Sequence, residues 1–496
     1  MAVTVGASRL DLGALRRLPA EARPLIRPGT ADAGVLHLGL GAFHRAHQAV
    51  YTEQAMALAG GDWGIVGVAP RNAELVRILA AQDNLFSVST LSAADRHTRV
   101  IGALAGVRLA AADPNAVVAL LADPAIRVVT LTVTEKAYQL DPAGGTLRPD
   151  PALVADLTTD RPPATVPGLL VRGLLARAAA DAGPIALVSC DNLPANGRRL
   201  RGLVSQALAY AGTPGPVVDW VGAQVGFPGT MVDRIVPAST PDTLAAARHA
   251  LGVEDLAAVA AEPYTQWVIE DDFPGGRPAW ERAGAVLCAD AGPWERLKLR
   301  ALNGVHSATA YLGALAGCET IADTLALPHL VTVLRRLIAE DVATSFTPPD
   351  GVDVVDYGEQ VLARFGNPAI RHRTLQVAMD GSQKLPQRIL HTIADLRAAG
   401  RPAHWATLVL AAWIRFAQGA TDAGRPLPLD DPLATRIRAA LAAAPQTPTG
   451  AVDAILALDE VVPPEIATDD QVRADVTTWL TDLQTHGVPA TLASAT

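Results

Sequence analysis

The chain of 496 residues is too long for one ordinary domain, so we expect two or three domains. Half of the residues are hydrophobic but only 4% are aromatic, which predicts cores built mainly from Ala, Leu and Val. The 41 basic and 50 acidic residues give a net charge of −9 without a basic block, which argues against a nucleic-acid partner.

Cysteine usage and hydropathy indicate the cellular compartment of the protein. Cys190, Cys288 and Cys318 are scattered without metal-ligand spacing, which fits a reducing environment better than a disulfide framework. Residues 1–30 lack the apolar core of a signal peptide, and no run of about 18 or more apolar residues occurs. The sequence therefore predicts a cytoplasmic protein with no membrane partner.

Short apolar runs alternate with helical patterns through the first half of the chain. The runs at 34–41, 63–68, 126–133 and 184–190 predict buried strands. This alternation predicts an α/β fold with a Rossmann-type, doubly wound, mostly parallel sheet.

After about residue 285 the apolar spacing becomes helical throughout. The clearest helical patterns lie at 327–346, 386–400, 404–420 and 431–444. We therefore predict a dinucleotide-binding domain over 1–285 and a mainly α-helical substrate-binding and catalytic domain over 286–496, with a loose tail after about residue 486.

"HLGLGAFHRAHQ" (37–48) places Gly39 and Gly41 between a predicted strand and a helix, where glycines let a backbone approach a pyrophosphate. His44 stands where the usual third glycine would fall, so the motif is incomplete, and a tight turn without a ligand stays open. His44 and His47 lack a third ligand at zinc spacing, so we predict no metal.

The residues after the second predicted strand bear on cofactor choice. An NAD-preferring site usually carries an acidic residue there, whereas this chain reads "APRNAE" (69–74). Arg71 could meet a 2′-phosphate, which favours NADP, stack on adenine, or be a solvated loop residue. The choice between NAD and NADP stays open on these grounds.

Lys298 stands out because the chain has only three lysines, Lys136, Lys298 and Lys384, among its 41 basic residues. Asn303 and His306 share a face of the helix predicted over 294–311. In α geometry Lys298 lies roughly 140° from Asn303 and about 7.5 Å along the axis, within reach of one small substrate.

A nicotinamide-dependent alcohol oxidation needs a base for the hydroxyl proton and donors for the forming carbonyl. A lysine whose pKa is lowered can be that base, whereas arginine cannot be deprotonated. Asn303 can donate, and so can Asn192 at the end of the fourth predicted strand. A surface lysine and a simple Asx turn are the alternative interpretations.

Seven segments carry a family resemblance, in one order from residue 39 to 388. They are "GLGAFHRAHQ", "TLTVTEKAY", "SCDNLPANG", "TMVDRIVPAST", "QWVIEDDF", "KLRALNGVHS" and "DGSQKLPQR". The chain resembles the long-chain mannitol dehydrogenase family of polyol and sugar-acid dehydrogenases. That family is metal-independent and joins a Rossmann-type domain to a helical one. Many of its members are monomeric, so we expect a monomer.

The resemblance implies roles for individual residues. Lys298 would be the general acid/base, Asn192 and Asn303 the pair that stabilises the alkoxide, and His306 the residue that orients the substrate. Asp233 would contact substrate hydroxyls. Glu135 and Glu295 would exchange protons with solvent, and the cofactor-binding set would be Gly39, Gly41, Phe43, Arg45 and Arg71.

Residues 371–388 resemble the fructuronate reductase (D-mannonate oxidoreductase) branch of the family. Arg373, Lys384 and Arg388 could bind a substrate carboxylate, or be helix-end or surface charges. We expect an NAD(P)-dependent reductase of D-fructuronate, with NAD the first choice of cofactor. A mannitol 2-dehydrogenase or arabinitol-type polyol dehydrogenase is the same-class alternative, and a non-catalytic dinucleotide sensor is the third.

Overall fold

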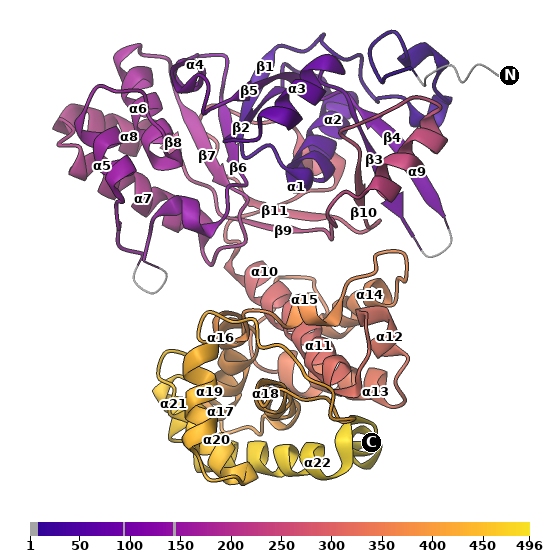
Figure 1. The fold of residues 1–496 in the computed structure, drawn as a ribbon. Helices are drawn as coiled ribbons and strands as arrows, with labels where there is room; N and C mark the ends of the chain where they lie inside the picture. Colours follow the sequence, from indigo (N-terminus) through magenta and orange to yellow (C-terminus); the bar gives the residue numbers. More distant parts are fainter. Residues whose placement is uncertain (1–7, 93–94, 142–144) are drawn as a thin grey trace, which may run out of the picture. The chain divides into compact units, whose positions relative to one another are not determined.

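The computed structural model describes residues 8–92, 95–141 and 145–496, which form two compact units that divide between Ala291 and Gly292 (Figure 1). The predicted domain boundary lies after residue 285. Strand β12 (Val286–Cys288) pairs in parallel with β11 (Gln266–Glu270), and this pairing keeps residues 286–288 in the first unit.

The first unit is built on a parallel sheet of six strands in the order β5-β2-β1-β6-β7-β8. This order reverses direction between β1 and β6, the arrangement of a Rossmann fold, which confirms the predicted fold class. The predicted runs became β1, β2, β6 and β7. The strands are β1 (Ala33–Leu38), β2 (Gly64–Ala69), β5 (Leu104–Leu109), β6 (Val128–Leu131), β7 (Ile185–Ser189) and β8 (Val225–Gly226).

Helices cover both faces of this sheet because successive strand residues point to opposite sides. Val35 and Ile65 face the core that includes α2, whereas Leu36 and Val66 face the core that includes α4 and α6. The helices of the unit are α1 (Ala42–Ala46), α2 (Gln48–Ala59), α3 (Ala73–Ala81), α4 (Pro114–Leu121), α5 (Pro151–Thr158), α6 (Val166–Ala179), α7 (Asn196–Tyr210), α8 (Gly215–Gln224) and α9 (Pro241–Leu251), with 3₁₀ turns η1 (Leu15–Arg17), η2 (Ala20–Ala22), η3 (Glu135–Tyr138) and η4 (Trp280–Ala283).

Two sheets of three short strands, which were not predicted, complete the first unit. One has the order β10-β3-β4, with β3 (Phe86–Leu91), β4 (Arg96–Ile101) and β10 (Val259–Ala261). The other has the order β12-β11-β9, in which β9 (Thr230–Asp233) runs antiparallel to β11.

The second unit is helical among the residues described, as predicted. Helices α11 and α18 are buried almost all round, which is typical of central helices, and α22 packs along α18. The elements are α10 (Gly292–Leu297), η5 (Lys298–Gly304), α11 (Val305–Ala316), α12 (Ile321–Leu325), α13 (Leu330–Arg336), η6 (Leu337–Val342), α14 (Val354–Phe365), α15 (Thr374–Ala378), α16 (Gly381–Leu385), η7 (Pro386–Leu390), α17 (His391–Ala398), α18 (His404–Ala417), α19 (Ala434–Ala443), α20 (Pro448–Leu456), α21 (Pro464–Ala467) and α22 (Asp470–Ala495).

The prediction of a loose tail after residue 486 was wrong. Gly487 interrupts α22 with a φ of +72°, but the helix resumes and buries Val488 and Leu492 completely. The Asp422 carboxylate accepts from the Val488 N–H at 2.7 Å and so caps the second half of the helix. Within the described ranges, no helix is long and apolar enough to cross a membrane.

Candidate active site

The glycine turn after β1 lies where the strand order of the sheet reverses. Gly39 has a φ of +102°, and a Cβ there would lie 2.1 Å from the carbonyl oxygen of Thr132, so only glycine fits. A Cβ at Gly41 would meet no atom nearer than the Gly39 carbonyl oxygen, 3.7 Å away. The backbone at position 41 is therefore open to close approach, which fits the pyrophosphate of a dinucleotide.

Two of the other predicted cofactor residues support this turn from within the protein. The buried Arg45 side chain donates from Nε to the Gly41 carbonyl at 3.2 Å and from Nη1 to the Ala257 carbonyl. Burial lowers the pKa of Arg45 to about 10. Phe43 stacks on His47, with 5.0 Å between ring centroids. Arg45 thus holds the turn from within the protein and Phe43 packs beside it, while their contact with a cofactor stays a prediction.

Arg71 lies at the carboxyl end of β2, before α3, and its side chain is exposed. This is the position after the second strand that bears on the choice between NAD and NADP.

The two histidines of the turn pack inside the protein. His44 stacks on His37 with 3.3 Å between ring centroids, and burial lowers the pKa of His44 well below its ordinary value. His47 makes a hydrogen bond of 2.9 Å from Nε2 to the Gln266 carbonyl oxygen. Across residues 8–92, 95–141 and 145–496, no three His, Cys, Asp or Glu side chains group as a metal site.

Glu135 and Asn192 follow the carboxyl ends of the adjacent strands β6 and β7, and both side chains are exposed. Because carboxyl ends of parallel strands meet at one edge, both residues lie at the edge that carries the glycine turn. Asp191, which was not among the predicted site residues, joins the two turns. Its carboxylate accepts from the N–H groups of Val133 and Thr134, at 3.1 and 2.9 Å.

Asp233 ends β9, where it pairs with Gln266 of β11, and its side chain is buried. The neighbouring Arg234 donates to the carbonyl oxygens of Glu262 and Ala46, which anchors this strand end to the rest of the first unit. The predicted substrate contact Asp233 therefore lies at the end of a strand that hydrogen bonds fix to the rest of the first unit.

Lys298 and Asn303 lie in a π-helical segment, η5, which interrupts the predicted α-helix between α10 and α11. A π-helix joins residues five apart by its hydrogen bonds, so residues i and i+5 lie closer to one face than in an α-helix. Lys298 and Asn303 are five apart. The offset of roughly 140° expected from α geometry is therefore wrong for this pair. Their side chains are 9% and 7% exposed.

His306 follows in α11 and is 8% exposed. Its ring stacks on Phe365 at 4.4 Å and meets His372 edge-on at 4.9 Å. Burial, and then the charges of His372, Arg388, Arg364 and Lys384, lower the pKa of His306 well below its ordinary value. Within the described part of the chain its Nε2 has no hydrogen-bond partner, so a neutral imidazole can bind a substrate hydroxyl.

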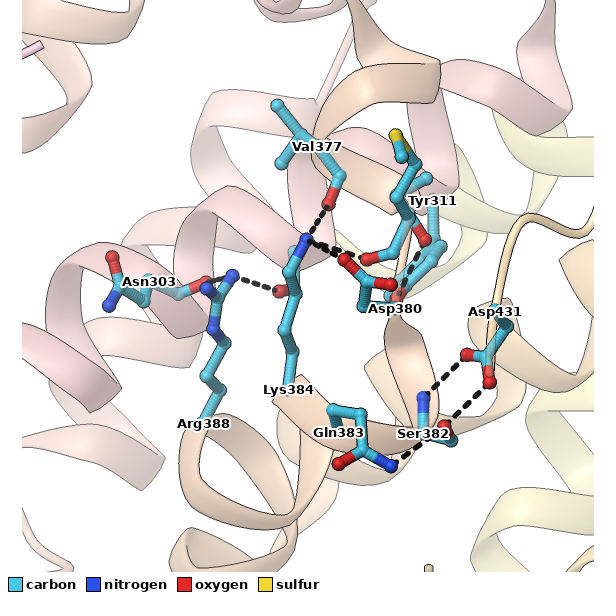
Figure 2. A network of polar contacts seen from close by, with 12 residues as sticks. Asn303, Tyr311, Val377, Asp380, Ser382, Gln383, Lys384, Arg388 and Asp431 are labelled. Carbon is cyan, nitrogen blue, oxygen red and sulfur yellow. Dashed lines mark hydrogen bonds and ion pairs between the residues drawn. The ribbon is translucent and has the colours of Figure 1, made fainter. Parts of the chain in front are cut away.

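Figure 2 shows two cations of α16 and η7 beside Asn303. Lys384 donates from Nζ to the Met379 carbonyl at 2.6 Å and lies 3.8 Å from the Asp380 carboxylate. Arg388 donates from Nη1 to Ser307 Oγ at 3.2 Å and to the Asn303 carbonyl at 3.5 Å. Burial lowers the pKa of both groups, to about 10 for Arg388, and each cation is held close to the other.

The remaining predicted residues of the second unit lie at its surface or partly exposed. Arg373 is exposed at the start of α15, and Glu295 is partly exposed in α10, one turn before Lys298. Arg364 and His372, which were not predicted, lie near enough to His306 to lower its pKa. A count of basic residues near the motif would not have found Arg364, because it comes from the separate helix α14.

Comparison with known proteins identifies both units. Residues 33–282 match the model of the mannitol dehydrogenase Rossmann domain, and residues 290–484 match that of the mannitol dehydrogenase C-terminal domain. The chain belongs to the mannitol dehydrogenase family. The predicted resemblance is confirmed, and membership makes the chain an NAD-dependent dehydrogenase that acts on secondary alcohols.

Individual members of this family resemble the chain along most of its length. It is 40% identical to the D-mannonate oxidoreductase of Escherichia coli over 83% of this chain and 85% of that one. It is 37% identical to the mannitol 2-dehydrogenase of Cereibacter sphaeroides over 95% and 98%. A solved structure, the ternary complex of Pseudomonas fluorescens mannitol 2-dehydrogenase with NAD and D-mannitol, superposes with a TM-score of 0.84 at 34% identity, over 98% and 99%.

Proposed function

We propose that this member of the mannitol dehydrogenase family interconverts D-fructuronate and D-mannonate with NAD(H). The supporting observation is the pair of partly buried cations, Lys384 and Arg388, beside Asn303. A buried cation is costly unless an anion compensates it, and the Asp380 carboxylate lies 3.8 Å from Lys384 and is partly exposed. A sugar-acid carboxylate would supply the compensating charge, and arginine suits its geometry.

In the direction of reduction, the bound nicotinamide supplies the hydride that adds to the ketone carbon of the substrate. Lys298 donates a proton to the ketone oxygen, which completes the secondary alcohol. The side-chain amides of Asn192 and Asn303 donate hydrogen bonds to that oxygen while negative charge develops on it. The reverse reaction uses the neutral amine of Lys298 as the base.

The other predicted residues bind the substrate or pass protons. His306 hydrogen-bonds a substrate hydroxyl through Nε2, and Asp233 accepts from another. Glu135 and Glu295 return protons between Lys298 and solvent. The glycine turn at Gly39 and Gly41 approaches the pyrophosphate of the cofactor.

A second candidate is oxidation of a neutral polyol such as mannitol or arabinitol. The relatives that support it are the mannitol 2-dehydrogenases, one of which has been solved with D-mannitol. Asp233 and His306 can bind hydroxyl groups of either substrate. The two candidates therefore differ in whether Lys384 and Arg388 have a carboxylate to bind.

A substrate and cofactor panel tests the proposal. We expect kcat/KM for D-fructuronate to exceed that for D-fructose by about 10- to 100-fold, the effect of one or two charge-assisted hydrogen bonds. Each ketone is measured with NADH and with NADPH, and the NADPH rates test whether Arg71 binds a 2′-phosphate. Preference for D-fructose would favour the polyol enzyme, and cofactor binding without turnover of any substrate would favour a sensor.

A further inference from the structure

Thr134 has a backbone conformation that threonine rarely adopts. Its φ is +74° and its ψ is 156°, a region occupied essentially by glycine alone. The cost is greater for a β-branched residue, because its side chain crowds the backbone. Strain of this kind persists only where the surroundings impose it, and it is concentrated at functional sites.

The Asp191 carboxylate is hydrogen-bonded to this strained backbone. Oδ1 accepts from the Thr134 N–H at 2.9 Å, and Oδ2 accepts from the Val133 N–H at 3.1 Å and from the Tyr138 hydroxyl at 2.7 Å. The Tyr138 hydroxyl is also hydrogen-bonded to Ser189 Oγ at 2.6 Å. Asp191 thus holds both ends of the segment from 133 to 138, and within the described residues each of its partners is a neutral donor.

The segment so held carries Glu135, the residue directly after Thr134 and the first of η3. Asp191 itself directly precedes Asn192, and its own carbonyl accepts from the Asn196 side chain at 3.1 Å, which fixes the turn after β7. The Asp191 carboxylate therefore binds the backbone next to Glu135, while its main-chain carbonyl is fixed in the turn next to Asn192.

We propose that Asp191 is a positioning residue of the reaction. Its carboxylate holds Thr134 in its strained conformation, which places Glu135, and ties this segment to the turn that carries Asn192. The inference rests on the proposed roles of those two residues. It does not depend on which sugar or sugar acid is the substrate.

The first test is Asp191→Asn, which keeps the size of the side chain but replaces one acceptor oxygen by a donor. We expect kcat to fall by about 100-fold, the effect of a small misplacement of reacting groups. KM and the dissociation constant of NADH should stay within about 3-fold, because substrate and cofactor binding are not the interactions removed. Tyr138→Phe removes only one of the three donors and should lower kcat by less.

Asp156→Asn is the matched control. Asp156 is also a buried carboxylate in the first unit, and it accepts from the N–H groups of Ala164 and Thr165 and from the Thr165 hydroxyl. Its loss should lower the thermal midpoint without changing kcat per folded molecule. The proposal requires that Asp191→Asn lowers kcat by more than the loss of folded protein explains.

The second test relieves the strain. Thr134→Gly adopts the observed backbone conformation at little cost, so the double variant Thr134→Gly with Asp191→Asn should regain most of the lost kcat. If Asp191→Asn does not fold, Thr134→Gly with Tyr138→Phe replaces it. The proposal would be overturned if neither Asp191→Asn nor Tyr138→Phe lowered kcat. It would also be overturned if the double variant recovered none of the lost kcat.

All variants are compared with wild type on the best substrate of the panel. The wild-type rates alone decide between a sugar acid and a polyol as substrate. The ratio of variant to wild type decides the part that Asp191 plays, whichever substrate is found.

Discussion

Lys298 and Asn303 stand five residues apart in the π-helical segment η5, at the spacing that a π-helix joins by hydrogen bonds. An α-helix would turn the two side chains well apart, whereas the π segment brings them toward one face. π segments are rare and are frequent at functional sites. The local backbone thus aligns Lys298, the proposed proton donor, with Asn303, the proposed hydrogen-bond donor to the alkoxide.

Gly304 permits the packing that accompanies this segment. A Cβ at Gly304 would lie 2.8 Å from the carbonyl oxygen of Arg388, so Gly304→Ala must push η7 away from η5. We expect a loss of about 1–3 kcal/mol in stability and a marked fall in kcat/KM for the sugar acid. Gly202→Ala is the control, because its Cβ would meet only Gln206 Nε2 at 3.9 Å and should not destabilise the protein. Equal thermal midpoints and rates for the two variants would contradict this account.

Lys384 should determine the preference for a charged substrate. Lys384→Met removes a cation that lies beside Arg388, so we expect KM for D-fructuronate to rise by about 10- to 100-fold. KM for D-fructose should change little. Arg335→Gln, which removes an exposed arginine paired with Glu359, should alter neither value. Equal effects of Lys384→Met on the two ketones would argue against carboxylate binding here.

His306 should act as a neutral imidazole. Its pKa is held well below the ordinary value of 6.5, so it carries no charge at neutral pH. His306→Asn should lower kcat/KM by about 10-fold through the lost hydrogen bond, while the midpoints of the pH profile between about pH 5.5 and 10 stay in place. His249→Asn, at an exposed position of α9, should change nothing. A wild-type midpoint near 6.5 that disappears in His306→Asn would refute this assignment.

Glu53 should make stability fall as pH rises. Its side chain is fully buried, and burial raises its pKa from 4.5 to about 7. Between those values the folded protein retains a proton that the unfolded chain has released, so the free energy of unfolding falls with rising pH. The loss is at most about 3 kcal/mol and is complete above about pH 7.

Thermal unfolding of Glu53→Gln across this pH range measures the effect. The amide can still accept from the Gly102 N–H, as Oε1 does at 2.6 Å. The wild-type midpoint should decline relative to that of Glu53→Gln as pH rises from about 4.5 to 7. Glu21→Gln, at an exposed position, should follow wild type. A parallel decline in Glu53→Gln would show that another group is responsible.

The sequence was sufficient for the features that local patterns determine. Continuous apolar runs predicted β1, β2, β6 and β7, and the residues at their carboxyl ends included Gly39, Glu135 and Asn192. Alternation with helices then predicted a Rossmann-type, doubly wound, mostly parallel sheet. These features depend on neighbours in the chain, which a single sequence displays.

The features that were missed depend on residues far apart in the chain. Val259 of β10 pairs with Val88 of β3, and Asp191 meets Thr134 only because β6 and β7 are neighbours in the sheet. The π segment η5 packs against η7 through Gly304, a contact that no local spacing reveals. Likewise, the order of the chain after residue 486 depends in part on Asp422, which caps the turn at Val488 and is distant in sequence.

The most direct test of the central claim is chemical rescue of Lys298→Ala. If Lys298 transfers the proton, its loss should lower kcat by about 100- to 10,000-fold while NADH still binds, and Lys298→Arg should be equally inactive. Added primary alkylamines should then restore part of the rate of Lys298→Ala, and the restored rate should vary with the pKa of the amine. Rates that do not respond to any amine, or a Lys298→Arg variant with nearly wild-type turnover, would contradict the account.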